Sequence, residues 1–282
     1  MRYLKLSLAL LAVGGFAGCR KSSPTSYMRA YSVFIRFPGG QDSWHWFDIV
    51  SVSPNFVPDV KFNGRQIPRE NIYYGFGEFI GGDTLPTISP NAEVQMEVKY
   101  RDLNEKDKTA SSKVKLPSEP SASVSITGGN IRVAWGKPDK KSVSFVYVEI
   151  YAECYYYDGD GYYYLSNFKD TVITDIENVT EVSRTLGTMC APITNPVAVR
   201  ARGTVVNFYG PWSGSKDNIK GIKGQYYGGT GVGDTTLWIA SSRVAKFDGK
   251  FNLNREEFFK RMINTIEKHF GVSEEGIWIN GF

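Results

Sequence analysis

Most of the chain consists of short runs in which apolar and polar residues alternate, and this pattern predicts β-strands. In the clearest run, residues 92–100, apolar side chains alternate with charged and amide ones: Val94, Met96, Val98 and Tyr100 against Glu93, Gln95, Glu97 and Lys99. We expect this strand to have one face in the core and one face in water. Residues 44–52 carry large apolar side chains at both odd and even positions, so a strand there is expected to be partly buried on each side.

The predicted strands fall into two sets, which are separated by a stiff joint with two prolines at residues 116–121. The first set, within residues 30–116, contains about six or seven short strands, and Asn63-Gly64 inside it is the strongest two-residue hairpin signal. The second set occupies residues 117–220. Short strands at this density, broken by Gly, Pro, Asn and Asp, predict an all-β chain of tandem β-sandwiches.

The last 60 or so residues follow a different pattern. Residues 221–233 are rich in glycine and are expected to form a loop, followed by a strand at 235–239. Asn254 with Glu257 three positions later predicts a helix N-terminus. An apolar stripe at helical spacing follows it, made of Phe258, Phe259, Met262, Ile263, Ile266 and Phe270.

We expect this amphipathic helix to end at Gly271 and to pack on a sheet, the alternative being a helix that binds a partner. Residues 277–279 could return as a strand. The sequence leaves open whether residues 221–282 belong to the second sandwich or form a small α+β extension.

The N-terminus has the layout of a secretory signal peptide. Two cations, Arg2 and Lys5, precede a short apolar run, and small residues lead to Cys19. The run is shorter than the ~20 residues that span a bilayer. The segment Phe16-Ala-Gly-Cys19 resembles a bacterial lipobox, with Phe16 departing from the usual Leu-like residue; ordinary cleavage after Ala17 is the alternative.

The lipobox resemblance implies removal of residues 1–18, lipidation (acyl chains such as palmitate) at Cys19 and a tether at 19–29. Arg20 stands where an Asp would signal retention at the inner membrane. The implied location is therefore the bacterial cell envelope, anchored by lipid, at the outer membrane if the source has one.

Residues from about 120 to 220 resemble a fibronectin type III module. The resemblance rests on Trp135 in Ile-Arg-Val-Ala-Trp, on Val146-Tyr-Val-Glu-Ile-Tyr151, and on Val197-Ala-Val-Arg-Ala-Arg202 followed by Gly210-Pro-Trp-Ser213. It covers about 100 of the 282 residues. Asn195 stands where the family usually has its corner tyrosine. The overall expectation is therefore tandem immunoglobulin/fibronectin III-like sandwiches with one C-terminal amphipathic helix.

Two cysteines remain once Cys19 is assigned to the lipid, and an extracytoplasmic compartment permits a disulfide between them. In the topology of the resembled family, the end of the third strand lies beside the start of the sixth. Cys154 is near the former and Cys190 just before the latter, so the resemblance implies a Cys154–Cys190 bridge. Two free buried thiols are the alternative.

Charge and composition limit the possible partners. Loss of Arg2 and Lys5 with the signal lowers the formal charge from +4 to +2. A chain this close to neutral lacks the basic stripe expected of a nucleic-acid-binding protein.

Catalytic groups are scarce in the sequence. The two histidines, His45 and His269, have no partners at metal-ligand spacing, and no nucleophile motif is present. Asp158-Gly-Asp-Gly161 lacks the further acidic positions of a calcium loop and reads as a hairpin turn. We therefore expect no enzymatic activity, no metal and no cofactor.

Aromatic residues make up 14% of the chain, and 17 of them are tyrosines. Tyr155, Tyr156 and Tyr157 precede the predicted turn and Tyr162, Tyr163 and Tyr164 follow it. These six residues form either a ligand platform or cross-strand pairs that only stabilise a hairpin. Trp44 and Trp46 likewise form either a ligand platform or contacts that only stabilise the fold.

The sequence therefore predicts a membrane-anchored, non-catalytic adhesion or scaffold lipoprotein that holds an unidentified envelope protein. The alternative is a lipoprotein that binds a glycan through the Tyr or Trp platforms.

Overall fold

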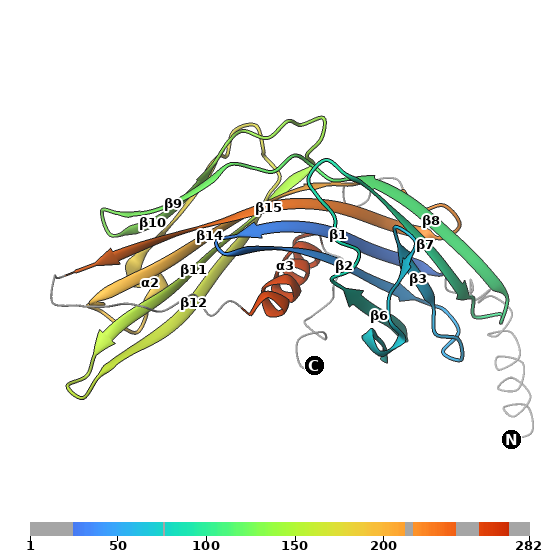
Figure 1. Ribbon diagram of the computed structural model, residues 1–282, viewed down its shortest axis with the longest axis horizontal. Coiled ribbons are helices and arrows are strands. Elements are labelled where there is room, and N and C mark those ends of the chain that lie inside the picture. The colour runs from blue at the N-terminus through green and yellow to red at the C-terminus, as the bar shows by residue number, and fades with distance from the viewer. Residues whose placement is uncertain (1–24, 76, 212–216, 241–253, 271–282) are drawn as a thin grey trace, which may run out of the picture.

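A single curved sheet of eight strands forms the frame of the computed structural model, which describes residues 25–75, 77–211, 217–240 and 254–270 (Figure 1). In sheet order its strands are β12 (Tyr162–Ile173), β11 (Phe145–Tyr157), β14 (Ala198–Tyr209), β15 (Lys223–Ile239), β1 (Tyr27–Phe37), β2 (Gly40–Val50), β6 (Glu78–Asp83) and β5 (Ile72–Gly75). Two smaller sheets pack on one face, here called the sandwich side. Helix α3 (Arg255–His269) packs on the other, here called the helix side.

Each smaller sheet completes one β-sandwich. The first sheet contains β4 (Arg65–Gln66), β3 (Asp59–Phe62), β7 (Glu93–Arg101) and β8 (Asp107–Lys115), and it packs mainly on β1 and β2. The second contains β13 (Glu181–Thr185), β10 (Asn130–Trp135) and β9 (Ala122–Thr127), and it packs on β11 and β14. The prediction of an all-β chain of tandem sandwiches is confirmed.

Several local predictions are also confirmed in the first sandwich. The apolar positions of β7 are buried while Glu93, Glu97 and Lys99 are exposed. Asn63 and Gly64 both have positive φ angles, +47° and +78°, in the turn between β3 and β4. Positive φ at both central residues is what a two-residue hairpin turn requires, and Asn followed by Gly adopts it at little cost.

The glycine-rich segment predicted as a loop is a strand, so this prediction is wrong. Strand β15 covers nearly all of it and is the longest strand of the described chain. Its first part pairs with β1 in parallel, from Tyr27↔Lys223 to Arg36↔Val232, and its second part pairs with β14. β15 therefore belongs to both sandwiches and joins them into one sheet.

Close packing explains why this strand contains so many glycines. Gly229, Gly231 and Gly233 alternate along the helix side. A Cβ atom added at Gly229 would lie 2.7 Å from the ring of Phe208, and one at Gly231 would lie 2.7 Å from Val206. Glycine inside a strand often marks such a close approach, because any larger residue would displace its neighbours.

Helix α3 begins where the sequence predicts and packs on the shared sheet. The Asn254 side chain accepts a hydrogen bond from the backbone N–H of Glu257 (3.1 Å), which caps the helix. The apolar stripe of α3 is buried against the helix side, together with alternate residues of β1 and β11. The prediction that the helix packs on a sheet is confirmed. Because α3 covers the middle of this sheet, β1 is buried on both faces.

Some predictions fall outside the described residues: the signal peptide at 1–18, Cys19 and most of the tether, Trp212, the helix stop at Gly271 and the strand at 277–279. Residues 27–29, predicted as the end of the tether, are instead the start of β1. There Met28 is fully buried and Arg29 pairs with Asp48. Within the described ranges, every helix is too short or too polar to cross a bilayer.

Candidate interaction surfaces

The hairpin between β11 and β12 turns at residues 158–161 and is held by one aspartate. The side chain of Asp158 accepts hydrogen bonds from the backbone N–H groups of Asp160 (3.0 Å) and Gly161 (3.1 Å), and Gly159 has a φ of +104°. The carboxylate that a calcium loop would need is therefore bound by the turn itself. The structure agrees with the interpretation of this segment as a hairpin turn.

Six tyrosines face one another across this hairpin. The ring centroids are 5.3 Å apart for Tyr155–Tyr164, 6.0 Å for Tyr156–Tyr163 and 5.2 Å for Tyr157–Tyr162. Because side chains alternate along a strand, the first and third pairs lie on the helix side and the middle pair lies on the sandwich side. The hairpin is therefore aromatic on both faces.

The exposed apolar side chains continue from the hairpin along β12. We define the aromatic hairpin surface as Tyr157 (55% exposed), Tyr162 (54%), Tyr163 (47%), Tyr164 (50%), Leu165 (40%) and Phe168 (39%). Tyr157, Tyr162, Tyr164 and Phe168 lie on the helix side of the hairpin, and Tyr163 and Leu165 lie on the sandwich side. Exposed apolar side chains gathered on one hairpin in this way are typical of interaction sites.

Tyr155 does not belong to this surface, which is therefore narrower than the sequence predicts. Its side chain is only 8% exposed, and its hydroxyl donates to Glu153 (2.8 Å) and accepts from Arg200 (2.5 Å). Burial, with the adjacent Glu153, raises the pKa of Tyr155 to about 12. Tyr156 is half-buried.

Trp44 and Trp46 lie on the helix side of β2, where α3 partly covers them. The ring of Trp44 stacks on Phe259 of α3 with centroids 5.2 Å apart, and Trp46 packs on Tyr31 at 5.6 Å. Both indoles are half-buried rather than open. They nevertheless line a groove of about 270 Å³ between α3 and strands β5 and β6. Sequence reasoning proposed the two tryptophans but missed the groove, because α3 supplies one of its walls.

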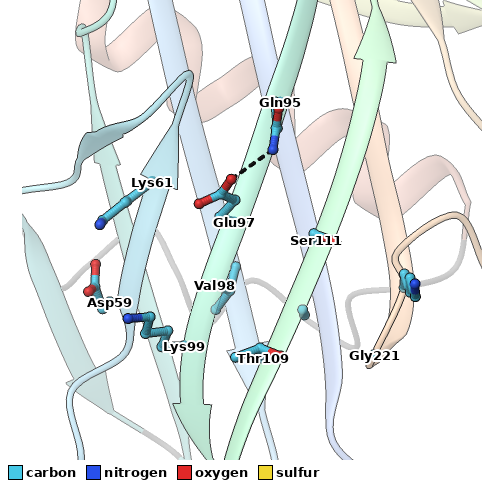
Figure 2. Close-up of a pocket in the computed structure, with 11 residues that line it drawn as sticks. Asp59, Lys61, Gln95, Glu97, Val98, Lys99, Thr109, Ser111 and Gly221 are labelled. Carbon is cyan, nitrogen blue, oxygen red and sulfur yellow. Dashed lines mark hydrogen bonds between the residues drawn. The ribbon is translucent and has the colours of Figure 1, made fainter.

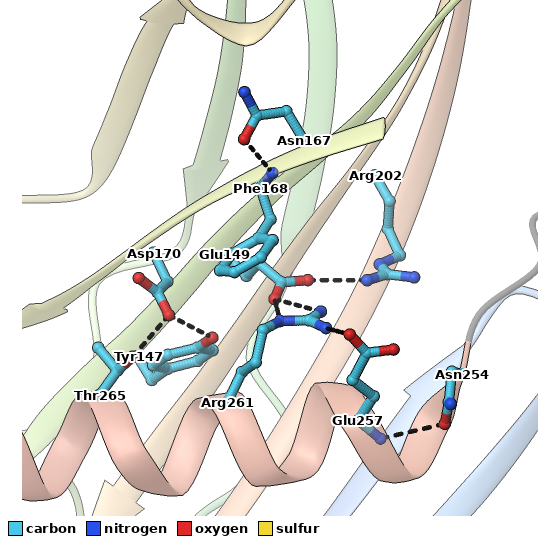
Figure 3. Close-up of polar contacts among 10 residues, drawn as sticks. All are labelled: Tyr147, Glu149, Asn167, Phe168, Asp170, Arg202, Asn254, Glu257, Arg261 and Thr265. Atoms are coloured by element: carbon cyan, nitrogen blue, oxygen red, sulfur yellow. Dashed lines mark hydrogen bonds and ion pairs between the residues drawn. The ribbon is translucent and has the colours of Figure 1, made fainter. Parts of the chain in front are cut away.

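The middle of α3 is held to the sheet by buried charged groups (Figure 3). Glu149 of β11 is fully buried and accepts from both Arg202 (2.7 Å) and Arg261 (3.0 Å). Although burial opposes the charge of Arg261, the neighbouring Glu149 raises the pKa of this arginine. One turn along the helix, Thr265 donates to Asp170 of β12 (2.6 Å). These contacts fix the helix in position over β11 and β12.

A second buried cluster holds the C-terminal end of α3. Arg29 of β1 pairs with Asp48 of β2 and lies 3.5 Å from Glu267 of α3. Burial raises the pKa of Asp48, and burial also raises the pKa of Glu267 to about 8 and that of Glu78 to about 7. Asp48 and Glu267 are shielded from solvent. We interpret the cluster as part of the helix attachment.

His45 is a core residue. Its Nδ1 atom lies 2.7 Å from the Ser32 hydroxyl, its Nε2 lies 2.8 Å from the Pro86 carbonyl oxygen, and its ring stacks on Phe62. Burial lowers the pKa of His45 to about 4. The imidazole is therefore neutral at pH 7.

We expect His45 to make stability pH-dependent. Between pH 6.5 and pH 4 the unfolded chain binds a proton at this residue that the folded chain does not. The free energy of unfolding should therefore fall by about 3 kcal/mol as the pH falls through this window. Urea unfolding of His45→Gln across these pH values should show a shallower slope than the wild type. An unchanged slope in His45→Gln would contradict the assignment.

A larger hollow, of about 520 Å³, lies on the solvent face of β3, β7 and β8 (Figure 2). Lys61, Lys99 and Lys220 alternate there with Asp59 and Glu97. Gln95 donates to Glu97 across 2.7 Å. The alternation predicted this face to be solvated, and the lining is a mixture of charges without an aromatic ring. We assign no site to it.

The Cys154–Cys190 disulfide predicted from the fibronectin resemblance is present, with Cα atoms 5.4 Å apart. Cys154 lies on β11, and Cys190 follows the short helix α2 (Leu186–Met189). Both cysteines are buried in the core of the second sandwich. Over the described parts of the chain, no group of His, Cys, Asp and Glu could hold a metal ion.

Comparisons with known proteins add little to this picture. No family model matches the chain, and no curated protein matches it. Among solved structures, the FN1–FN3 domains of chicken CNTN1 are similar to it at 14% sequence identity and a TM-score of 0.25. The match covers 73% of this chain and 64%, less than two thirds, of that one. The strand pairing described above establishes an all-β chain of tandem immunoglobulin/fibronectin III-like sandwiches with one packed C-terminal helix.

Proposed function

We propose that the protein is a membrane-anchored, non-catalytic lipoprotein of the bacterial cell envelope that docks a protein partner on its aromatic hairpin surface. The observation that carries the proposal is the clustering of six exposed apolar side chains on one hairpin and the adjoining strand. Four of them are tyrosines, which are enriched at protein interfaces because they combine a large apolar area with a polar tip.

The position of β12 in the sheet supports a protein partner. Among the described strands β12 is an edge strand, paired with β11 alone, and residues 162–166, 168 and 169 are exposed. The backbone N–H of Phe168 donates to the side chain of Asn167 (2.9 Å), which places this amide at the open edge (Figure 3). A long apolar edge strand can pair with an extended segment of another chain. A partner could therefore contact both the rings and the backbone.

The non-catalytic part of the proposal is supported by the chemistry of the buried groups. Both nitrogens of His45 are occupied by Ser32 and Pro86. Asp48 and Glu267, two carboxylates whose pKa values are raised by burial, lie beside Arg29 under α3. Each therefore has a structural role in the packed sheet.

Affinity capture from detergent-solubilised membranes tests the proposal that the aromatic hairpin surface docks a protein partner. The bait is the full chain, either as wild type or with serine at Tyr157, Tyr162, Tyr163 and Tyr164. We expect the wild type to retain one stoichiometric envelope protein and the variant to lose it. Serine at Tyr73 and Tyr74, which are each 49% exposed on a different strand, is the matched control and should retain the partner.

Retention by the hairpin variant would refute the docking site. Suppose instead that the wild type captures no protein but binds a glycan, and that Tyr156→Ala or Tyr163→Ala abolishes this binding. The carbohydrate alternative would then replace the protein-docking site. Because each cross-strand aromatic pair contributes only about 0.2–1 kcal/mol, the variants are expected to fold.

The anchor rests on the resemblance of the N-terminus to a lipobox and on the secretory layout before it. We expect Cys19→Ala to remain unprocessed and unlipidated, because the acyl chains attach through the Cys19 thiol. Metabolic labelling with palmitate should therefore mark the wild type and not the variant. Equal labelling of both proteins would contradict the anchor and leave the hairpin proposal unaffected.

A further inference from the structure

We infer that the groove between α3 and the β5–β6 end of the large sheet binds a single pyranose ring of a neutral saccharide. Trp44 and Trp46 of β2 form its floor, and Tyr73 of β5 lies at the sheet edge. Phe259 of α3 forms part of the opposite wall. Besides the buried His45, the remaining polar residues that line it are Asn71, Asp83, Thr84, Glu256 and Lys260.

The aromatic lining suits one face of a sugar ring. Aromatic faces carry negative partial charge, and the C–H groups on one face of a pyranose are weakly positive, so the two surfaces attract one another. Phe259 stacks nearly parallel to Trp44, with ring planes 18° apart, which holds that indole in a fixed orientation. Gly82 is the cross-strand neighbour of Trp46, and a Cβ atom there would lie 3.5 Å from the Trp46 ring. A Cβ atom at Gly82 would also lie 2.9 Å from the backbone oxygen of His45, so close packing excludes a side chain from this position beside the indole.

The charges around the groove favour a neutral ligand over an anionic one. Glu256 and Lys260 form an ion pair across 2.8 Å, so their charges largely cancel. The Asp83 carboxylate accepts a hydrogen bond from the backbone N–H of Thr84 (2.6 Å). The groove therefore lacks an excess of cations for an anionic ligand, and the one uncancelled charge among its described lining residues, the Asp83 carboxylate, can accept hydrogen bonds from the hydroxyl groups of a neutral sugar. Carboxylate, amide and hydroxyl groups beside aromatic rings are suited to ring hydroxyls.

The size of the groove limits the ligand to about one ring. Its volume of about 270 Å³ lies just below the 300–1,000 Å³ of pockets that enclose drug-sized molecules. For a ligand of about a dozen heavy atoms, ordinary ligand efficiency gives a Kd on the order of 1 mM. Biologically useful binding at this affinity would require several copies of the anchored protein on one polymer.

This site is independent of the proposed partner surface. The groove is built from α3 and from β2, β5 and β6 of the first sandwich, whereas the aromatic hairpin surface is at the end of β11 and β12 in the second (Figure 1). Variants can therefore remove one function and leave the other.

Saccharide binding in the groove is tested by titrating the full chain, in detergent, with methyl glycosides of glucose, galactose, mannose and N-acetylglucosamine. Binding is read by saturation-transfer NMR and by tryptophan fluorescence. We expect at least one glycoside to bind with a Kd on the order of 1 mM and to change the fluorescence of the groove tryptophans. Tyr73→Ala should weaken this binding by about tenfold or abolish it.

Tyr74→Ala is the matched control, because Tyr74 is as exposed as Tyr73 but does not line the groove. It should leave the affinity within about twofold of the wild type. Failure of all four glycosides to bind the wild type would overturn the inference, as would binding that survives Tyr73→Ala. Binding that Tyr163→Ala abolishes would place the sugar on the hairpin and also overturn it. Loss of the protein partner in the capture experiment has no bearing on these results.

Discussion

Glu149→Ala is expected to lower the free energy of unfolding by about 3–5 kcal/mol, because it breaks a buried ion pair from one side. Glu149 is fully buried and neutralises Arg202, which is itself 2% exposed, while it also binds Arg261 of α3. Without the carboxylate, Arg202 would be left as a buried charge without a counterion at that position. Urea unfolding followed by circular dichroism measures the change.

Glu257→Ala is the matched control for this variant. Glu257 also pairs with Arg261, at 3.3 Å, but its side chain is 62% exposed. Exposed ion pairs one helical turn apart contribute about 0.3–0.5 kcal/mol, so this variant should stay close to the wild type. If Glu149→Ala also unfolded within about 1 kcal/mol of the wild type, α3 would not be attached to the sheet as described.

Removal of the Cys154–Cys190 disulfide is expected to cost about 4 kcal/mol. The bridge closes a loop with a sequence separation of 36, and the chain-entropy relation gives this value for a loop of that length. The Cys154→Ala/Cys190→Ala variant should therefore unfold at a much lower urea concentration than the oxidised wild type. It also removes two side chains from a closely packed core, which adds to the loss.

Two further measurements separate the bridge from the packing. Wild type unfolded in the presence of a reductant should lose most of the same stability, because only the crosslink is removed. Thiol counting by mass, under denaturing and non-reducing conditions, should find neither Cys154 nor Cys190 free. Two free thiols at these positions would contradict the disulfide.

Local signals in the sequence were sufficient for much of the fold. The alternation in residues 92–100, the Asn63-Gly64 turn and the Asn254 cap depend on neighbours a few residues apart. The disulfide was predictable for a different reason: in the resembled topology Cys154 lies near the end of one strand and Cys190 just before another strand that lies beside it.

Long-range contacts explain what the sequence concealed. The glycine-rich sequence of β15 is typical of a loop, because the close contacts with Phe208 and Val206 that require glycine form only in the folded chain. The parallel pairing of β1 with β15 joins residues about 200 positions apart, and no local pattern indicates it. It merges two predicted domains into one sheet.

The candidate sites show the same difference between features set by local sequence and features set by long-range contacts. The hairpin tyrosines are adjacent in sequence and meet across a two-strand turn, so their clustering could be predicted. The burial of Tyr155 depends on Arg200, which lies on the neighbouring strand β14. The groove at Trp44 needs α3, which lies more than 200 residues further along the chain. Only the folded chain brings these groups together.

Site-specific photocrosslinking in intact membranes tests the proposed docking surface most directly. A benzophenone amino acid replaces Tyr163 in one protein and Tyr74 in the other, two residues with similar exposure of 47% and 49% on different surfaces. We predict one discrete crosslinked product with an envelope protein at position 163 and none at position 74. The absence of a product at position 163, or the same product at both positions, would contradict the proposal that the aromatic hairpin surface docks a protein partner.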